Sequence, residues 1–212
     1  MVDLPQLPLG TSHRDRLIAG LAQSIRERGY RATKITDVVA RARTSRRSFY
    51  EQFEDRDDCY LALFDTLGEL LAAAVAEAVD PTAPWERQVD QALGAYLDAI
   101  TAEPELTVSF HRELPALGER GAARQRAGIE SFAELLMRLA GTESMQREGV
   151  EPVSRAKAVM LVGGMRELIA HAVEAGDSLD EVRVAAAEVI KGALAPEAAR
   201  RRTAAGPPRA GG

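Results

Sequence analysis

Two short segments with helical periodicity, residues 33–42 and 45–53, follow each other in this sequence with only two residues between them. In both segments the apolar residues recur three and four positions apart, as they do on one face of a helix. Thr33 and Ser45 stand where each helix would begin, and both are residue types that cap helix N-termini. Helices this short and this closely joined cannot lie parallel, so the sequence predicts a steeply crossed helix-turn-helix.

The rest of the chain shows the same helical periodicity and no alternating segment that would indicate a sheet. An amphipathic helix is expected from His13 to Gly29, and a long one is expected to be capped by Asp55 or Asp57 and to end before Pro81. Further helices are expected over residues 85–103, 105–114, 117–139, 156–175 (capped by Ser154) and from Asp177 or Ser178 to Pro196, with a loop over 141–152. The predicted fold class is all-α.

The charge distribution divides the chain into unlike parts. The net charge is −5, yet the stretch from His13 to Tyr50 contains ten arginine and lysine residues against three acidic ones, a local charge of +7 that leaves −12 for the remainder. A basic head joined to an acidic body is typical of a DNA-binding domain attached to another domain. We therefore expect an arm over 1–12, a helix-turn-helix domain over 13–58, a helical domain over 59–196 and a disordered tail over 197–212.

The second helix of a helix-turn-helix enters the major groove of DNA. Phe49 and Phe53 lie four residues apart and are expected to face inward, which leaves a polar set on the outside: Arg46, Arg47, Tyr50 and Gln52. Arginine pairs with guanine and glutamine with adenine, whereas hydroxyl groups and helix N-termini bind phosphates. The alternative is that the arginines only solvate a surface helix.

The stretch GYRATKITDVVARARTSRRSFYEQFEDRDDCYLALF, residues 29–64, resembles the signature region of TetR-family transcription regulators. The shared features are the glycine-aromatic end of the first helix, the Thr-x-x-x-Asp-Val-x-Ala second helix, the Ser-x-x-Ser-Phe-Tyr-x-x-Phe recognition helix and the acidic-basic-acidic start of the fourth. The resemblance implies that Thr33, Tyr50 and Arg56 touch phosphates, and that the recognition helix reads bases. The full set of predicted DNA contacts is Thr33, Thr44, Ser45, Arg46, Arg47, Ser48, Tyr50, Gln52 and Arg56.

The sequence departs from the family pattern at two positions. The family has glycine in the turn and at the third position of the recognition helix, where this chain has Arg43 and Arg47. If the turn requires a positive φ, Arg43 is strained by roughly 1–3 kcal/mol, and glycine there would raise stability. The additional arginines are expected to steepen the salt dependence of DNA binding.

The resemblance implies that the body binds an effector and that its last two helices pair across a two-fold axis. Residues 156–165, AKAVMLVGGM, are too apolar for a helix with one wet face. Gly163 and Gly164 each cost about 1 kcal/mol in a helix interior, which is explained by a close approach of two backbones or by space for a ligand. A simple buried helix is the alternative. The predicted dimer residues are Val162, Gly163, Ile169, Val182, Val189 and Ile190.

Large side chains on the predicted body helices are candidates for an internal effector pocket, although ordinary core packing would also explain each of them. The candidates are Phe64, Trp85, Tyr96, Phe110, His111, Phe132 and Met165. Together they favour an apolar ligand, with Tyr96, His111 or Arg112 as its polar contacts.

Nothing in the sequence predicts an enzyme, a metal site or a cofactor. Glu167 and His171 are spaced for a shared metal, but no second pair accompanies them, so a surface salt bridge is expected. Gly-rich phosphate loops, Gly-x-Ser-x-Gly and His-Glu-x-x-His are absent. The single cysteine, Cys59, excludes an internal disulfide, and no secretory signal or spanning run is evident, so we expect a cytoplasmic protein.

The sequence thus predicts a homodimeric repressor that binds double-stranded operator DNA, has no membrane partner, and is released by a small apolar effector that tilts the fourth helix. Repression is expected in preference to activation. Two alternatives remain open. One is a DNA-binding regulator without an effector. The other is an apolar-ligand carrier whose basic head serves a protein or membrane partner.

Overall fold

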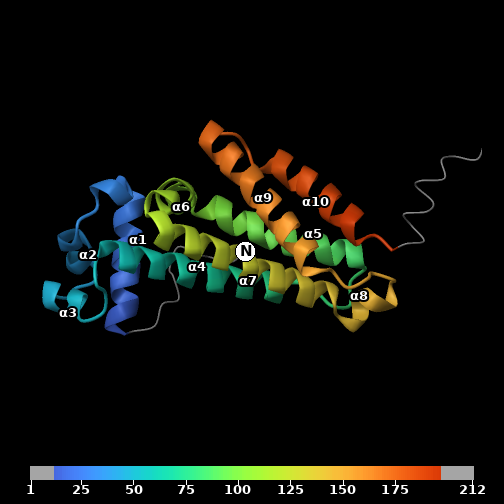
Figure 1. The fold of residues 1–212 in the computed structure, drawn as a ribbon, viewed down its shortest axis with the longest axis horizontal. Helices are drawn as coiled ribbons and strands as arrows, with labels where there is room; N and C mark the ends of the chain where they lie inside the picture. Colours follow the sequence, from blue (N-terminus) through green and yellow to red (C-terminus); the bar gives the residue numbers. More distant parts are fainter. Residues whose placement is uncertain (1–11, 197–212) are drawn as a thin grey trace, which may run out of the picture.

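The computed structural model describes residues 12–196, and every regular element among them is a helix (Figure 1). The helices are α1 (His13–Ala32), α2 (Ile35–Arg41), α3 (Arg46–Tyr50), α4 (Arg56–Ala78), α5 (Trp85–Ala102), α6 (Pro104–Ala116), α7 (Gly118–Ala140), α8 (Glu143–Arg147), α9 (Arg155–Ala175) and α10 (Asp180–Leu194). The all-α prediction is confirmed. Apart from Ser12, the predicted arm and tail lie outside the described residues.

The head consists of α1, α2 and α3, at one end of the molecule (Figure 1). The apolar stripe of α1 that contains Leu17 and Leu21 is fully buried, and the predicted inward-facing Phe49 and Phe53 are 0 % and 2 % exposed. Helices α1 and α2 approach so closely at Gly20 that an added Cβ would lie 2.7 Å from the carbonyl oxygen of Val38. The short α3 is therefore supported from below by a tightly packed pair of helices.

Three of the predicted N-caps are confirmed. The Ser45 hydroxyl accepts from the Ser48 N–H at 3.1 Å, Asp55 accepts from the Asp58 N–H at 2.6 Å, and Ser154 accepts from the Lys157 N–H at 3.3 Å. Each cap satisfies a backbone donor that the first helical turn leaves without a partner.

The prediction that Thr33 caps α2 was wrong. Lys34 occupies the N-cap position, and the Thr33 hydroxyl instead donates to the carbonyl oxygen of Gly29 at 2.8 Å. Gly29 itself has φ of +76°, so α1 is interrupted at the predicted stop residue although helical turns continue to Ala32. Glycine tolerates this left-handed conformation because it has no Cβ.

Two boundaries in the body differ from the prediction. The expected loop over 141–152 contains the single-turn helix α8, which is capped by Thr142 and anchored by the buried Met145. Helix α10 begins at Asp180 with Leu179 as its N-cap, two or three residues after the predicted start. Both differences involve about one helical turn. A single turn is too short to show the apolar periodicity from which a helix is predicted, and one buried side chain is enough to hold it in place.

Helices α4, α5 and α7 run lengthwise away from the head, α9 and α10 run obliquely to them, and α8 lies at the far end (Figure 1). Helix α4 joins the two parts, because its Cys59, Tyr60 and Leu63 belong to the core of the head whereas Val75 is buried in the body. By length and composition alone α4 is apolar enough to cross a membrane. However, it packs against α1, α5 and α7 within the protein, as a core helix does.

Candidate nucleic-acid interface and ligand cavity

The outer surface of α3 carries the predicted set of base-reading side chains. Arg46, Arg47, Tyr50 and Gln52 are all exposed, and Gln52 lies just beyond the last helical residue. Tyr50 is 57 % exposed, and its ring meets that of the buried Phe49 edge to face, with ring centroids 5.5 Å apart. The polar set therefore projects from a helix whose opposite side is fixed in the core.

The arginines of the basic head differ in whether their side chains have partners within the protein. Four of them are held in ion pairs away from α3: Arg26 with Glu103, Arg28 with Asp37, Arg31 with Glu113 and Arg41 with Glu27. By contrast, within the described part of the chain no ion pair or hydrogen bond engages the side chain of Arg43 or Arg46. Positive charge that remains available to an external anion is therefore concentrated at the turn and at the start of α3.

Arg47 and Arg14 have defined partners next to this surface. The Arg47 Nε lies 3.0 Å from Glu51, one turn along the chain, although the Arg47 side chain is 90 % exposed. Arg14 reaches across from α1, with its guanidinium carbon 4.5 Å from the ring centroid of Phe53 and its Nη1 donating to the carbonyl oxygen of Gln52 at 3.4 Å. Arg14, which was not predicted as a site residue, thus supports the end of the recognition segment.

The turn between α2 and α3 has the strained geometry that the glycine-to-arginine departure predicts. Arg43 has φ of +50°, and among the described residues it is the one non-glycine residue with positive φ. Such a conformation brings Cβ close to the backbone and is strongly disfavoured for a residue other than glycine, asparagine or aspartate. The conditional prediction about the turn is confirmed in its geometry.

Two predicted phosphate contacts lie elsewhere than expected. Thr33 is 0 % exposed with its hydroxyl turned toward Gly29, so the prediction that it touches a phosphate was wrong. The Arg56 Nη1 donates to the carbonyl oxygens of Thr33 at 2.7 Å and Tyr30 at 3.3 Å, and its guanidinium carbon lies 4.2 Å from the Tyr30 ring centroid. Arg56 therefore fastens the joint between α1 and α2 to α4, and its phosphate contact stays a prediction.

The three remaining hydroxyl groups lie at the N-terminal end of α3. Thr44 and Ser48 are half-buried, and Ser45 is exposed. The Ser45 and Ser48 hydroxyl oxygens lie 3.1 Å apart and share a hydrogen bond. Their phosphate contacts stay predictions, since no DNA is present.

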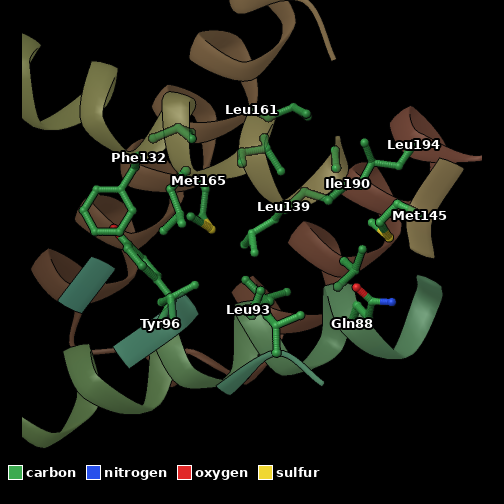
Figure 2. Close-up of a pocket in the computed structure, with 18 residues that line it drawn as sticks. Gln88, Leu93, Tyr96, Phe132, Leu139, Met145, Leu161, Met165, Ile190 and Leu194 are labelled. Carbon is green, nitrogen blue, oxygen red and sulfur yellow. The ribbon is translucent and has the colours of Figure 1, made fainter. Parts of the chain in front are cut away.

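The body contains a partly open cavity of about 420 Å³ lined by residues of α4, α5, α6, α7 and α9. Of the predicted pocket residues, it is lined by Phe64, Tyr96, Phe110, His111 and Phe132. A second, narrower cavity of about 90 Å³ lies farther from the head and is lined by the predicted Met165 (Figure 2). The body therefore contains two adjoining spaces where the sequence predicted one.

The prediction that Trp85 and Arg112 contact a ligand in the cavity was wrong. Trp85 is 8 % exposed, belongs to a core cluster with Val89 and Met145, and lines neither cavity. Arg112 is exposed on α6 and likewise lines neither. Apolar periodicity identifies a buried face but does not distinguish a cavity wall from a filled core.

The two cavities share a wall made by Tyr96, Phe132 and Val162. The rings of Tyr96 and Phe132 meet edge to face with centroids 5.3 Å apart. Figure 2 shows these two rings at one end of the narrow cavity and Leu194 and Met145 at the other. A ligand that extends from one cavity into the other must pass these side chains.

The larger cavity has a polar corner that the sequence analysis missed in part. Arg166 of α9 lines it beside the Gln125 amide, whose oxygen accepts hydrogen bonds from the Arg166 guanidinium when the amide is oriented with that oxygen toward the arginine. Burial raises the pKa of Tyr96 to about 12, with Arg166 acting in the opposite direction. Burial, and secondarily Arg166, lowers the pKa of His111 from its ordinary value of 6.5, so its imidazole is neutral near neutral pH.

A sequence signal for Arg166 existed. It stands four residues after Val162 and three before Ile169, and both of these apolar residues are buried. A charged residue on the apolar stripe of a helix indicates a buried or cavity-facing charge, since positions three and four apart share a face.

For three of the six predicted dimer residues the prediction was wrong, because they are already buried within the protomer and cannot contact a partner. Val162, Ile169 and Val182 are 9 %, 1 % and 6 % exposed. Ile190 lines the narrow cavity, Gly163 is half-buried, and Val189 is 59 % exposed. Three further apolar residues on the same two helices, which were not predicted, are exposed, namely Met160, Leu168 and Val184.

The Glu167–His171 pair lies on the surface, with 3.7 Å between Oε1 and Nε2 and both side chains more than half exposed. Across residues 12–196, no three histidine, cysteine, aspartate or glutamate side chains gather into a metal-binding group.

Residues 17–63 match the family model described as bacterial regulatory proteins, tetR family. Comparison with curated proteins gives no match. Among solved structures, a transcriptional regulator from Rhodococcus sp. Rha1 superposes with a TM-score of 0.66 at 19 % identity, covering 86 % of this chain and 96 % of that one. Regulatory protein TetR from Rhodobacter sphaeroides gives 0.58 at 17 % identity, with 86 % and 96 % covered.

The transcriptional regulator FadR from Bacillus subtilis gives a TM-score of 0.65 at 14 % identity, with 85 % of this chain and 97 % of that chain covered. At such identities the likeness concerns the fold, which extends over nearly the whole described chain. The family model covers the helix-turn-helix, which carries the exposed recognition surface, and the start of α4. The head of this chain therefore matches the model of bacterial regulatory proteins of the tetR family over residues 17–63, and the all-helical chain shares its fold with these solved structures.

Proposed function

We propose that this protein is a homodimeric repressor that binds operator DNA through α3 and releases it when an effector with a large apolar part occupies the body. The observation that carries the proposal is the exposed set of Arg46, Arg47 and Tyr50 on α3 and Gln52 just after it, in a segment anchored by the buried Phe49 and Phe53. A rigid helix with outward guanidinium and amide groups suits the major groove.

The proposed contacts divide by chemistry. Arg46 and Arg47 pair with guanine O6 and N7, and Gln52 pairs with adenine. Tyr50 and the hydroxyls at the N-terminal end of α3 (Thr44, Ser45 and Ser48) bind phosphates. Arg43, exposed in the turn and without an internal partner among the described residues, adds charge beside the DNA backbone.

We assign residues 13–58 to the DNA-binding head and 59–196 to the effector-binding and dimerising body. This division describes function and is not a structural boundary. Helix α4 runs from the head into the body, and Leu106 and Leu114 of α6 are buried in the core of the head. A change in the body that displaces α4 or α6 therefore also displaces the head.

The proposed dimer surface consists of the exposed apolar residues of α9 and α10. Met160, Gly164 and Leu168 are spaced four apart on α9, and Val184 and Val189 lie on α10. No other atoms lie within 4 Å of a Cβ added at Gly164, so this glycine leaves room for a helix of the partner. A two-fold dimer presents two recognition helices to the two half-sites of an operator.

A row of aromatic contacts supports the proposed coupling between effector and head. Phe110 of the cavity wall lies 5.2 Å from Phe64 and 5.5 Å from Tyr60, by ring centroids, and Tyr60 lies 4.1 Å from Tyr30. The Tyr30 ring in turn packs against Arg56 at the joint of α1 and α2. The B. subtilis FadR structure contains stearoyl-CoA, so a protein of this fold accommodates a ligand with a long apolar chain.

The test is DNA binding to the region beside the protein's own gene, by footprinting and titration at several salt concentrations. We expect a saturable footprint, and we expect Arg47→Ala or Arg46→Ala to weaken it by about 1–3 kcal/mol per lost guanine contact. Arg155→Ala is the matched control, because its side chain is 71 % exposed but lies on α9 in the body.

The proposal would be contradicted if DNA binding is weak, does not depend on the DNA sequence, and is equally weak in the α3 variants and in Arg155→Ala. The large body cavity would then favour an apolar-ligand carrier, with the basic head serving a different partner.

A further inference from the structure

We propose that the effector is an amphipathic anion, with its charged head at Arg166 in the larger cavity and a long unbranched chain that passes Tyr96 and Phe132 into the narrow cavity. The inference rests on the proposed effector role of the body and assigns a chemical class to the ligand. A free fatty acid and an acyl thioester with a phosphorylated head share this chemistry.

Arg166 is the cation of the larger cavity that has no acidic partner among the described residues. Arg124, the other cavity arginine, is 2.7 Å from Asp65, and the cavity carboxylate Glu103 is 2.7 Å from Arg26. The polar contact of the half-buried Arg166 is the neutral amide of Gln125. A partly desolvated charge without a counterion is unfavourable, so an anionic ligand gains free energy by supplying one.

The surroundings of Arg166 add uncharged hydrogen-bonding groups. The Tyr96 hydroxyl and the His111 imidazole line the same cavity, and within the described chain neither makes a hydrogen bond. No side-chain nitrogen or oxygen that is fully sealed from solvent lacks a partner in that chain, so these two groups are accessible in the cavity. A hydroxyl and a neutral imidazole both donate to an anion.

The acidic groups of the larger cavity do not favour a cationic head. Asp65 and Glu103 are already paired with arginines, and Glu69 is exposed on α4. A cation inside would have to displace one of these pairs while lying close to Arg166. The arrangement therefore selects for a negative head.

The narrow cavity suits only an apolar chain. Its two side chains with polar groups are Tyr96 and Gln88, and the Gln88 amide already donates to the Ala83 carbonyl oxygen at 2.8 Å and to the Ser144 hydroxyl at 3.0 Å. The remaining lining is aliphatic, aromatic or methionine, as Figure 2 shows. A polar head placed there would lose its hydration without gaining a partner.

The first experiment compares four ligands with the same sixteen-carbon chain on the full-length protein without DNA: the carboxylate, the coenzyme A thioester, the alcohol and the trimethylammonium. Binding is followed by calorimetry, below the concentration at which each ligand forms micelles. We expect at least one anion to bind saturably and at least tenfold more tightly than the alcohol and the ammonium. Which anion binds more tightly identifies the source of the head.

Arg166→Gln should weaken anion binding by about 10- to 100-fold and leave alcohol binding unchanged, because the lost contact involves only the charge. Arg155→Gln, on the same helix but largely exposed, should leave both unchanged. Equal anion binding by wild type and Arg166→Gln, or tighter binding of the ammonium, would overturn the assignment.

A second experiment tests the path of the chain. In the wild type, affinity for saturated carboxylates should rise about fourfold per methylene from eight to sixteen carbons. Ala92 lines the narrow cavity but not the larger one, so Ala92→Leu should stop this rise at a shorter chain. Two results would overturn the placement of the chain in the narrow cavity. One is a wild-type affinity that does not depend on chain length, and the other is a folded Ala92→Leu variant whose affinities rise with chain length as in the wild type. Because no DNA is present, these results stand apart from a failure of operator binding.

Discussion

Arg26 of α1 and Glu103 at the start of α6 form a bidentate ion pair, with both N–O distances 2.7 Å. The side chains are 27 % and 12 % exposed, so the pair is largely shielded from water. It joins the head directly to the helix that forms one wall of the larger cavity, because Glu103 also lines that cavity. The head is thus tied to the body at a point next to the proposed ligand.

Replacing one partner of this pair should destabilise the protein. We expect Glu103→Gln to lower the free energy of unfolding by about 1–2 kcal/mol, since a charge-assisted bidentate pair is lost at a shielded site. Denaturant titration monitored by helix content provides the measurement. Arg155→Gln is the control, because its pair with Glu130 is equally short at 2.6 Å but 71 % of the arginine side chain is exposed. Equal effects of the two substitutions would contradict the structural role of Arg26–Glu103.

The strained turn predicts a stabilising substitution. Arg43→Gly should raise the free energy of unfolding by about 1 kcal/mol and the melting temperature by about 2–4 °C, because glycine adopts φ of +50° without steric conflict. Arg43→Ala removes the same charge but keeps a Cβ, so it should bring no such gain. If both variants melt alike, charge rather than backbone strain is responsible.

Burial of His111 predicts a stability that depends on pH. Its pKa is lower in the folded protein than the ordinary 6.5, so the unfolded chain binds more protons between the two values. The contribution of His111 to stability is therefore complete above pH 6.5 and is lost progressively as the pH falls below it. His111→Gln should flatten the fall in unfolding free energy between about pH 7 and pH 5. His171→Gln, at a side chain 78 % exposed, should leave the profile as in wild type.

The close contact of α1 with α2 predicts that the head tolerates no side chain at Gly20. A Cβ there would lie 2.7 Å from the Val38 oxygen and 3.2 Å from the Ala42 nitrogen, and both are backbone atoms that cannot move independently. Gly20→Ala should lower the unfolding free energy by about 1–3 kcal/mol and weaken DNA binding. Gly192→Ala, in a helix with open space around the added Cβ, should be neutral or stabilising. If Gly20→Ala leaves the unfolding free energy and DNA binding unchanged, the close packing of α1 against α2 is not required.

Much of the head could be predicted from sequence because its signals are local. A serine or aspartate before a helical stretch satisfies backbone donors within the same turn, as Ser45, Asp55 and Ser154 do. Two phenylalanines four residues apart define the inner side of a short helix and leave the neighbouring arginines outside. Such relationships need no knowledge of distant residues.

The exceptions in the head depend on distant partners. Thr33 could serve as a cap or as a phosphate ligand by its type, but its burial beneath Gly29 decides otherwise. Arg56 follows the family pattern, yet its guanidinium binds the carbonyl oxygens of Tyr30 and Thr33, more than twenty residues earlier in the chain.

The sequence alone determined the helical architecture, the position of the recognition helix and the concentration of basic residues near it, because periodicity, capping and composition are properties of short segments. Only the tertiary structure decided what each apolar face meets. Val162 and Ile169 face inward, whereas Met160 and Leu168 on the same helix face solvent. Only the tertiary structure, too, placed Arg166 in a cavity beside groups from three other helices. An apolar stripe has the same pattern whether it faces a core, a cavity or a partner, since burial depends on which helices pack around it.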